Sequence, residues 1–204
     1  LLLILTFFYG FHSNSLNPVE ETIELRAVLI QGNVPVEKRF PFQQPGETRE
    51  ELIERYSANV QEILEHYETL TSLYADKDYD LIVWPETAIP HTFHDQRTYR
   101  YLNAILAQTE SQLIVGNEVL YIGEDGKPEE VYNGMVWMQG STELRQVYHK
   151  IHLVPFGEYI PFRWFPLMEW VLGRLIPANF THGDEHNMIH LQDPNIDVIP
   201  AICF

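Results

Sequence analysis

The chain has 204 residues, of which 45% are hydrophobic and 21% are charged, a composition typical of a globular protein. Its length suits one domain with a sizeable core. A formal net charge of -16 argues against a nucleic-acid-binding surface, because such a surface needs clustered Lys and Arg. The single cysteine, Cys203, excludes an intrachain disulfide.

The N-terminal segment Leu1 to Phe11 is an apolar run without charge. It is too short to cross a bilayer, which takes about 20 helical residues. We interpret residues 1–17 as the end of a transmembrane helix plus a polar linker; a signal-peptide core and a buried strand are the alternatives. Residues 18–204 are then expected to form one domain, incomplete at its C-terminus. Glutamates without basic residues in Pro18 to Glu24 favour the non-cytoplasmic side.

The first predicted strand is Leu25 to Ile30, an apolar run that ends at turn-forming residues. Further on, Thr48 and Glu51 form a capping-box pattern, which predicts the start of a long helix. The apolar positions of this helix recur at helical spacing: Leu52, Tyr56, Val60, Ile63, Tyr67, Leu70 and Tyr74. The pattern predicts an amphipathic helix packed on a sheet.

The next segments alternate between strand and helix patterns. A buried strand is predicted at Leu81 to Trp84, closed by Pro85, and a helix follows around Tyr99 to Gln108. A third strand is predicted at Leu113 to Leu120. This alternation indicates parallel strands with helical crossovers.

The C-terminal half has a different pattern. Val131 to Gln139 and Leu144 to Tyr148 predict a hairpin, so the sheet is expected to be mixed. Ile151 to Asn187 is rich in aromatic residues and has no convincing strand, and connections of this length are usually functional. The strand pattern resumes at Met188 to Leu191 and Val198 to Phe204.

Three reactive side chains lie at or just after predicted strand ends, where open α/β sheets usually carry their sites. Glu86 follows the second strand, Lys150 follows the hairpin, and Cys203 lies at the end of the last strand. Each residue alone is common as a solvated carboxylate, a surface lysine or a small buried thiol. Their joint occurrence in these sequence contexts is more informative.

The order Glu, Lys, Cys in these contexts resembles the nitrilase, or carbon-nitrogen hydrolase, superfamily. Within it, four motifs resemble the apolipoprotein N-acyltransferases. They are QGNVP (Gln31 to Pro35), WPETAIP (Trp84 to Pro90), YNGMVW (Tyr132 to Trp137) and HKIHLVPFGEYIP (His149 to Pro161). The last motif is long and the most specific of the four.

The resemblance implies an α/β fold, a nitrilase-like α-β-β-α sandwich truncated at the nucleophile strand. It implies a periplasmic catalytic domain carried by helices of the bacterial inner membrane, and no metal or organic cofactor. The implied reaction moves an acyl chain from a membrane phospholipid to the N-terminal α-amine of diacylglyceryl-cysteine on an apolipoprotein. The phospholipid donor, the modified apolipoprotein and the membrane are the expected partners.

The same resemblance implies roles for the reactive residues. Cys203 is the expected nucleophile, and Glu86 the general base that takes its proton. Lys150 is expected to stabilise the oxyanion. Glu158 matches a second glutamate of the family motif and is expected to position Lys150 or the amine; the alternative is a loop carboxylate bonded to backbone amides.

Aromatic residues of the long connection are expected to meet lipid, namely Phe156, Tyr159, Trp164 and Trp170. The alternative is a small core beneath a long loop. Trp84 and Trp137, by contrast, lie in strand patterns and are predicted to be buried.

Two other functions remain open at this stage. A soluble nitrilase-type amidase would use the same Glu, Lys and Cys to hydrolyse a small amide; it predicts a tight polar pocket and no membrane segment. A truncated, inactive fragment or a binding module is the other reading, since a parallel sheet cut at its nucleophile strand would leave an unpaired edge.

Overall fold

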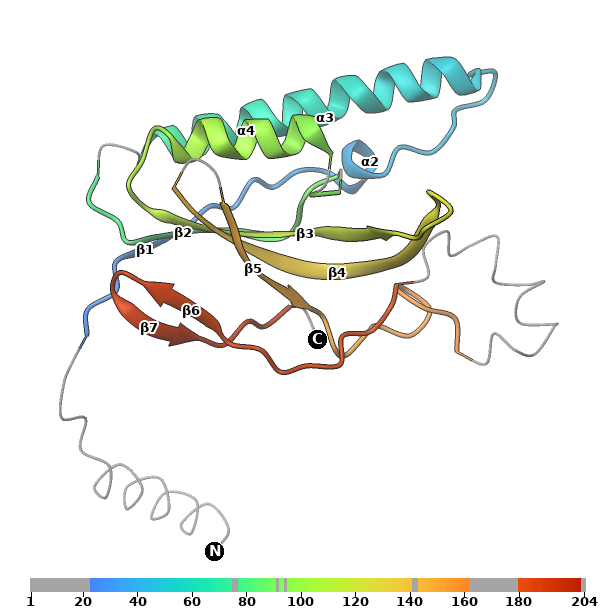
Figure 1. Ribbon diagram of the computed structural model, residues 1–204. Helices are drawn as coiled ribbons and strands as arrows, with labels where there is room; N and C mark the ends of the chain where they lie inside the picture. Colours follow the sequence, from blue (N-terminus) through green and yellow to red (C-terminus); the bar gives the residue numbers. More distant parts are fainter. Residues whose placement is uncertain are drawn as a thin grey trace, which may run out of the picture.

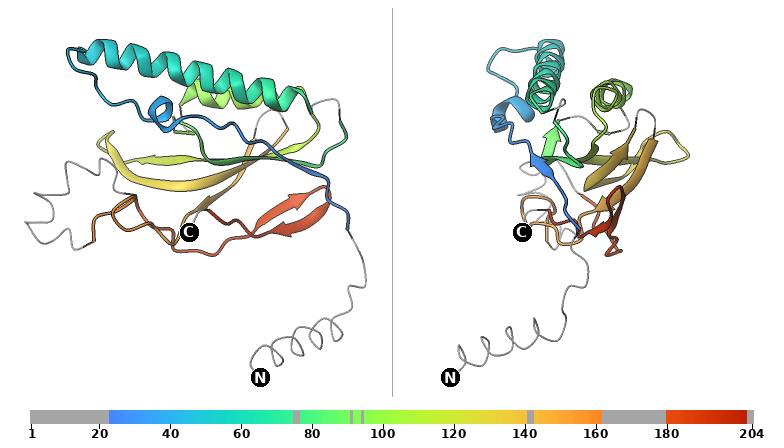
Figure 2. Two further views of the ribbon diagram at one scale, coloured as in Figure 1. Left: turned by 180° about the vertical axis from the view of Figure 1, so that it is seen from behind. Right: turned by 90° about the vertical axis from the view of Figure 1, so that its left-hand side faces the viewer.

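The computed structural model describes residues 23–74, 77–90, 92–93, 95–140, 143–161 and 180–202. The predictions for residues 1–17 lie outside this part of the chain. Two long helices cover one face of a five-stranded sheet, and a short hairpin lies below the other face (Figures 1 and 2). The expected mixed α/β sheet is confirmed.

The sheet has the order β1-β2-β3-β4-β5, the same as the order in the chain. The first three strands pair in parallel, and β3, β4 and β5 pair antiparallel. Their bounds are Ala27–Leu29 (β1), Leu81–Ile89 (β2), Gln112–Ile122 (β3), Pro128–Gln139 (β4) and Glu143–His149 (β5).

Strand β2 continues past Pro85 to Ile89, so the prediction that Pro85 closes this strand is wrong. The pairing with β3 shifts register here, from Trp84 opposite Val115 to Ile89 opposite Asn117. A proline has no N–H for the ladder and is tolerated in a strand at such an irregularity. Glu86 therefore lies inside an irregular strand, not after its end.

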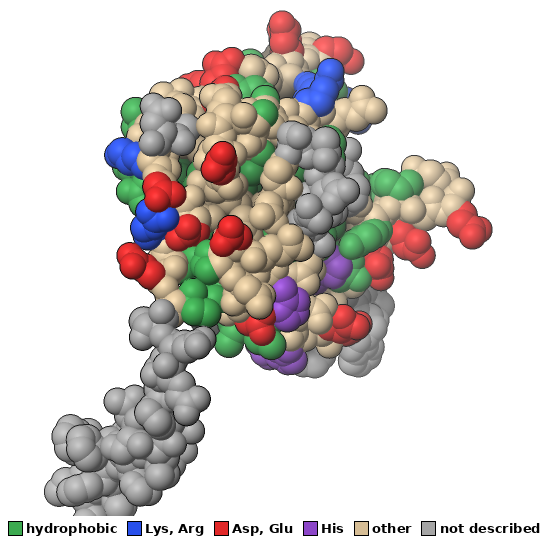
Figure 3. Space-filling model, turned by 60° about the vertical axis from the view of Figure 1, so that its left-hand side comes forward, with side chains coloured by type: hydrophobic (Ala, Val, Ile, Leu, Met, Phe, Trp, Pro, Cys, Tyr) green, Lys and Arg blue, Asp and Glu red, His purple; other side chains and the backbone are tan. Residues whose placement is uncertain are grey.

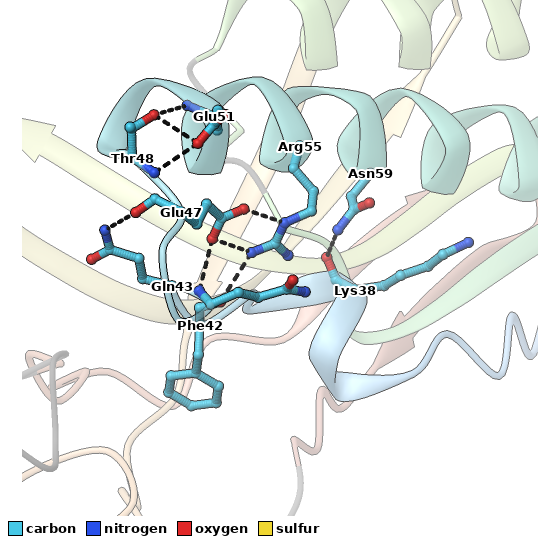
Figure 4. A network of polar contacts seen from close by, with 9 residues as sticks. Lys38, Phe42, Gln43, Glu47, Thr48, Glu51, Arg55 and Asn59 are labelled. Atoms are coloured by element: carbon cyan, nitrogen blue, oxygen red, sulfur yellow. Dashed lines mark hydrogen bonds and ion pairs between the residues drawn. The ribbon is translucent and has the colours of Figure 1, made fainter.

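Helix α3 (Arg49–Ser72) begins at the predicted cap. Thr48 Oγ1 accepts from the Glu51 N–H at 3.2 Å, and Glu51 Oε2 accepts from the Thr48 N–H at 2.8 Å. Figure 4 shows how this end of α3 is tied to the preceding segment, chiefly by the Arg55 guanidinium on the Glu47 carboxylate. One turn of helix, α2 (Val36–Arg39), was not predicted, since a single turn has no periodicity to recognise.

The main core lies between the helices and the upper face of the sheet. Tyr67 of α3 stacks on Trp84 of β2 with ring centroids 4.6 Å apart. The Trp84 indole N–H donates to Thr71 Oγ1 at 3.1 Å, so its polar atom is satisfied inside the core. Helix α4 (Gln96–Leu106) completes this layer with Leu102, which is fully buried. Burial of Trp84 is confirmed.

The last two strands, β6 (Ile189–Gln192) and β7 (Asn195–Val198), form a separate antiparallel hairpin. The predicted strand Val198 to Phe204 is therefore wrong over residues 199–202, and residues 203 and 204 lie outside the described part. A turn at Asp193-Pro194 reverses the chain early, and β7 pairs with β6 instead of joining the main sheet.

A second, smaller core lies under the sheet. Ile189 and Leu191 of β6 pack against Leu81, Ile114 and Trp137 on the lower face. Trp137 is 3% exposed, so its predicted burial is confirmed. The sheet is thus covered on both faces, which is what its nearly continuous apolar strands require.

The surface carries scattered charges. On the face in Figure 3, acidic side chains are dispersed among polar and apolar ones, and basic side chains are few. Within the part of the chain that the structure describes, no helix combines the length and hydrophobicity needed to cross a membrane.

Candidate active site

Glu86, Lys150 and Glu158 come together below the sheet. The Lys150 ammonium lies 3.3 Å from Glu86 Oε1 and 3.0 Å from Glu158 Oε1. Glu86 comes from β2, Lys150 directly follows β5, and Glu158 belongs to the loop after it. Cys203, Trp164 and Trp170 lie outside the described residues.

Asn133 of β4 completes this cluster. Its side-chain Nδ2 donates to Glu86 Oε1 and to Glu158 Oε1, each at 2.6 Å. Two donors, Nδ2 and the Lys150 Nζ, thus face the same two carboxylate oxygens and close a ring of four polar atoms. We call Glu86, Asn133, Lys150 and Glu158 the polar tetrad.

Sequence reasoning did not single out Asn133, although it lies in the YNGMVW motif. The available signal was its place in the strand. It shares the face of β4 with Met135 and Trp137, and a polar residue at such a buried position needs partners.

The tetrad is largely removed from water. Lys150 is 3% and Asn133 4% exposed, whereas the Glu86 side chain is 31% exposed. Burial acts to lower the pKa of Lys150, but its contacts with Glu158 and Glu86 outweigh this effect and the pKa is raised. Burial acts to raise the pKa of Glu158, yet hydrogen bonds from the Val154 amide, Asn133 and Lys150 hold it below its ordinary value.

With both carboxylates ionised and the ammonium protonated, the tetrad carries a formal charge of minus one. Uptake of one proton makes it neutral. Glu86 is the carboxylate with access to solvent, and within the described part of the chain its Oε2 has no hydrogen-bond partner. Glu86 is therefore the group best placed to accept a proton from a bound reactant.

The backbone around Lys150 is held on two sides. Its N–H donates to the Asn133 carbonyl at 2.8 Å, and its carbonyl accepts from the Gly183 N–H at 2.9 Å. A Cβ at Gly183 would lie 2.4 Å from the His149 carbonyl oxygen, so only glycine allows this close approach. The backbone of Lys150 is thereby hydrogen-bonded to β4 on one side and to the segment that begins at Phe180 on the other.

Gly116 of β3 lets Glu86 reach the tetrad. A Cβ at this position would lie 2.5 Å from the Pro85 carbonyl oxygen and 2.6 Å from the Glu86 Cα. The irregular part of β2 therefore rests directly on the β3 backbone. From there the Glu86 side chain crosses β3 and meets Asn133 on β4.

Glu158 organises the loop that follows Lys150. Its Oε2 accepts from the Val154 N–H at 2.8 Å, and its carbonyl accepts from the Phe180 N–H at 2.9 Å. Its Oε1 meets Lys150 and Asn133. One carboxylate oxygen of Glu158 thus holds the loop, and the other faces the ammonium.

His149, the residue before Lys150, is fixed by aromatic contacts. Its ring stacks on Tyr132 with centroids 4.0 Å apart, and its Nε2 lies 3.2 Å from the Tyr121 hydroxyl. Burial lowers the pKa of His149, which favours the neutral ring at pH 7. The contacts join β3, β4 and β5 at the strand ends that precede Lys150.

An open hollow of about 450 Å³ adjoins the loop after Lys150, lined by Ile151, His152, Leu153, Tyr159, Phe180 and His182. Of the expected lipid-contacting residues, Tyr159 lines this hollow. Phe156 is 57% exposed and has a left-handed backbone with φ of 63°. Among the described residues, no group of three or more His, Cys, Asp and Glu side chains is arranged to hold a metal ion.

Comparison with known proteins shows the family of this chain. The model of the carbon-nitrogen hydrolase family matches residues 42–199. Apolipoprotein N-acyltransferase of Methylococcus capsulatus is 34% identical over 185 residues, covering 88% of this chain and 31% of the relative. The Brucella suis protein of that name is 34% identical over 129 residues, covering 61% of this chain and 24% of the relative.

The chain spans about a quarter to a third of the length of these relatives. Among solved structures, a carbon-nitrogen hydrolase from Helicobacter pylori is 18% identical, covering 61% of this chain and 40% of that one, with a TM-score of 0.39. The family model covers most of the described residues and includes Glu86, Asn133, Lys150 and Glu158. The chain belongs to the carbon-nitrogen hydrolase family.

Proposed function

We propose that this chain carries the catalytic site of an apolipoprotein N-acyltransferase, with Glu86, Lys150 and Cys203 as catalytic residues. The observation that carries the proposal is the contact of the Lys150 ammonium with the Glu86 carboxylate in a largely buried site. The similarity to proteins named apolipoprotein N-acyltransferase supports the choice of reaction.

In the first half of the reaction, the Cys203 sulfur attacks the ester carbonyl of a phospholipid. A thiol is a poor nucleophile, so Glu86 takes its proton as the new C–S bond forms. The lysophospholipid alkoxide leaves with that proton, and the acyl group remains on Cys203 as a thioester.

Lys150 stabilises the negative oxygen of the tetrahedral intermediate. Its ammonium is buried and held by two carboxylates, and its main chain is held by backbone hydrogen bonds, so little reorganisation is needed when the charge develops. Glu158 and Asn133 position this ammonium. Removal of one such donor typically costs about 100-fold to 1000-fold in rate.

In the second half, the α-amine of diacylglyceryl-cysteine attacks the thioester. The C–N bond forms, the C–S bond breaks and the Cys203 sulfur leaves. Glu86 accepts a proton from the nitrogen and returns one to the sulfur, so the enzyme is regenerated. The scheme is ping-pong, because the first product leaves before the amine reacts.

The hollow beside the loop after Lys150 suits the acyl donor. Ile151, Leu153, Tyr159 and Phe180 provide apolar surface, and Phe156 projects from the same loop into solvent. We infer that these side chains meet the lipid, with Trp164 and Trp170 from the adjoining segment, at the periplasmic face of the bacterial inner membrane. An exposed aromatic side chain suits such an interface.

Intact mass spectrometry of the full-length protein tests the proposal. Incubation with phosphatidylethanolamine and no acceptor is expected to add the mass of one acyl group, released by hydroxylamine and absent in Cys203→Ala. Lys150→Ala is expected to slow acylation about 100-fold to 1000-fold. Lys127→Ala, which changes an exposed lysine on a turn, is the matched control.

No mass gain in the wild-type protein would exclude the acyltransferase. Turnover of small amides in its place would indicate a soluble amidase. Wild-type rates in Cys203→Ala or Lys150→Ala would overturn the assignment of these catalytic residues.

A further inference from the structure

The part of β2 that carries Glu86 lacks regular pairing with the neighbouring strand. In the β2–β3 register, Pro85 to Ala88 face a single residue of β3, Gly116. Extra residues on one strand of a pair are left without ladder partners and bend the strand locally. The catalytic carboxylate therefore belongs to the least regularly paired part of β2, and other contacts are needed to fix its path.

Thr87, the residue after Glu86, has a strained backbone. Its φ is 49°, in the left-handed region. A β-branched residue rarely adopts this conformation, and the conformation persists only where the surrounding structure holds it. The turn beside the catalytic carboxylate therefore needs a contact that keeps it in place.

Arg39 of α2 supplies such a contact. Its Nη1 donates to the Thr87 carbonyl oxygen at 3.4 Å, and its Nη2 donates to the Val34 carbonyl oxygen at 3.0 Å. One planar guanidinium thus joins the turn after Glu86 to the loop after β1. Sequence reasoning did not single out Arg39.

The guanidinium of Arg39 is half-buried and lacks a carboxylate partner. Within the described part of the chain it forms no ion pair, and its Nε is buried without a hydrogen-bond partner. Burial raises the pKa of Tyr67, and the charge of Arg39 acts to lower it, so the guanidinium lies close to this residue of the upper core. An arginine kept in such a place without a counter-ion, with its donors on two backbone carbonyls, is suited to hold the main chain.

Helix α2 gives Arg39 a fixed base. The Asn59 side chain of α3 donates to the Lys38 carbonyl at 3.1 Å (Figure 4). The Lys38 ammonium pairs with Glu62, one turn further along α3. The residue before Arg39 is thus anchored to the long helix through its backbone and through its side chain, and α2 connects this helix to the turn at Thr87.

We propose that Arg39 positions the general base: by holding the Thr87 carbonyl, it keeps the Glu86 carboxylate within reach of the proton that Glu86 transfers. The inference rests on the proposed function. Arg39 acts through the backbone of the turn and takes no proton itself. A displacement of about 1 Å at a reacting group can cost on the order of 100-fold in rate, so the loss of one backbone contact beside the base is sufficient to slow the reaction.

Arg39→Met removes both hydrogen bonds and keeps an unbranched apolar side chain. Because Glu86 acts in both half-reactions, acyl-enzyme formation from phosphatidylethanolamine and reaction of the isolated acyl-enzyme with a diacylglyceryl-cysteine peptide are both expected to slow about 10-fold to 100-fold. The phosphatidylethanolamine concentration that gives the half-maximal rate should not change. Arg39→Lys keeps a donor and should recover part of the rate. Arg100→Met, which removes a guanidinium that donates to a carbonyl of its own helix, is the matched control.

A double-mutant cycle gives a readout that a general loss of structure would not move. Arg39→Met is expected to add no further loss to Glu86→Gln, because the base that Arg39 positions is already absent. An equal fold-loss with and without Glu86, or wild-type rates in Arg39→Met, would overturn the positioning role alone.

Urea denaturation shows whether Arg39→Met is folded, and if it is not, the same cycle with Arg39→Lys decides by the same outcomes. Absence of any acyl-enzyme in the wild-type protein would overturn the proposed function, and the positioning role with it.

Discussion

At the scale of single residues, Gly116 decides whether β2 can bring Glu86 to the tetrad. The backbones of β2 and β3 approach so closely that any side chain at this position would overlap Pro85 and Glu86. The atoms in the way belong to the backbone and cannot rotate aside. The irregular part of β2 and the glycine beneath it therefore act together.

Gly116→Ala is expected to displace Glu86 and to destabilise the fold by about 1–3 kcal/mol, the usual cost of overpacking. Acylation should fall together with stability, and urea denaturation and the acyl-enzyme assay measure the two effects. Gly123→Ala is the control, because its Cβ would meet only the ends of flexible side chains. Unchanged acylation in Gly116→Ala would contradict the role of this close approach.

The residues of the site differ in how well the sequence predicts them. Glu86, Lys150 and Glu158 lie in motifs long enough to suggest them. Asn133 is recognised only when the structure shows that its amide contacts both Glu86 and Glu158. Its significance depends on strand pairing, which is a property of the folded sheet.

At the scale of elements, helix α3 shows how local chemistry sets a boundary. Thr48 and Glu51 satisfy each other's backbone N–H groups at its first turn, and the Arg55–Glu47 pair holds the segment before it. Hydrogen bonds from Arg55 and from the Gln44 amide lower the pKa of Glu47 to about 2. The N-terminus of α3 was predictable because these contacts span only a few residues.

Thr48→Ala is expected to destabilise the protein by about 1 kcal/mol, since it removes the side-chain acceptor of the cap. Thr48→Ser keeps the hydroxyl and should retain most of the stability. Chemical denaturation of the two variants measures the difference. Equal losses in both would show that the hydroxyl does not contribute, and acylation should be unaffected in either, because the cap lies on the helical side of the sheet.

Strand ends were less predictable than the helix start. Pro85 suggested the end of β2, yet the strand continues through it because the register shifts against β3 at this point. The last strand was predicted to begin at Val198. The observed strand β7 instead ends at Val198, because it pairs with β6 in a hairpin. Apolar alternation shows that a segment is extended but not which partner it takes.

At the scale of the whole molecule, the tetrad links the fold to pH. The pKa of Glu158 is lowered in the folded protein, so its stabilising contribution is present above its unfolded pKa and is lost as the pH falls through the folded value. The pKa of Lys150 is raised, so its contribution is present below its unfolded pKa and is lost as the pH rises through the folded value. The tetrad is expected to favour the folded state between these limits.

Glu158→Gln is therefore expected to reduce the dependence of stability on pH below about pH 5, near the unfolded pKa of a glutamate. Urea unfolding between pH 3 and pH 7 measures this slope. Glu124→Gln, at an exposed turn, should leave the slope as in the wild type. An unaltered slope in Glu158→Gln would show that Glu158 does not link folding to protonation.

The sequence by itself determined the alternation of strands and helices, the capped start of α3, the burial of Trp84 and Trp137, and the resemblance to carbon-nitrogen hydrolases. These features depend on periodicity, local hydrogen bonds and short motifs, which are properties of neighbouring residues. Only the tertiary structure decided that Glu86 passes over Gly116 and that Asn133 joins two carboxylates. Those contacts join residues that are far apart in the chain, and they exist only because strand register and the close approach of backbones bring them onto one face of the sheet.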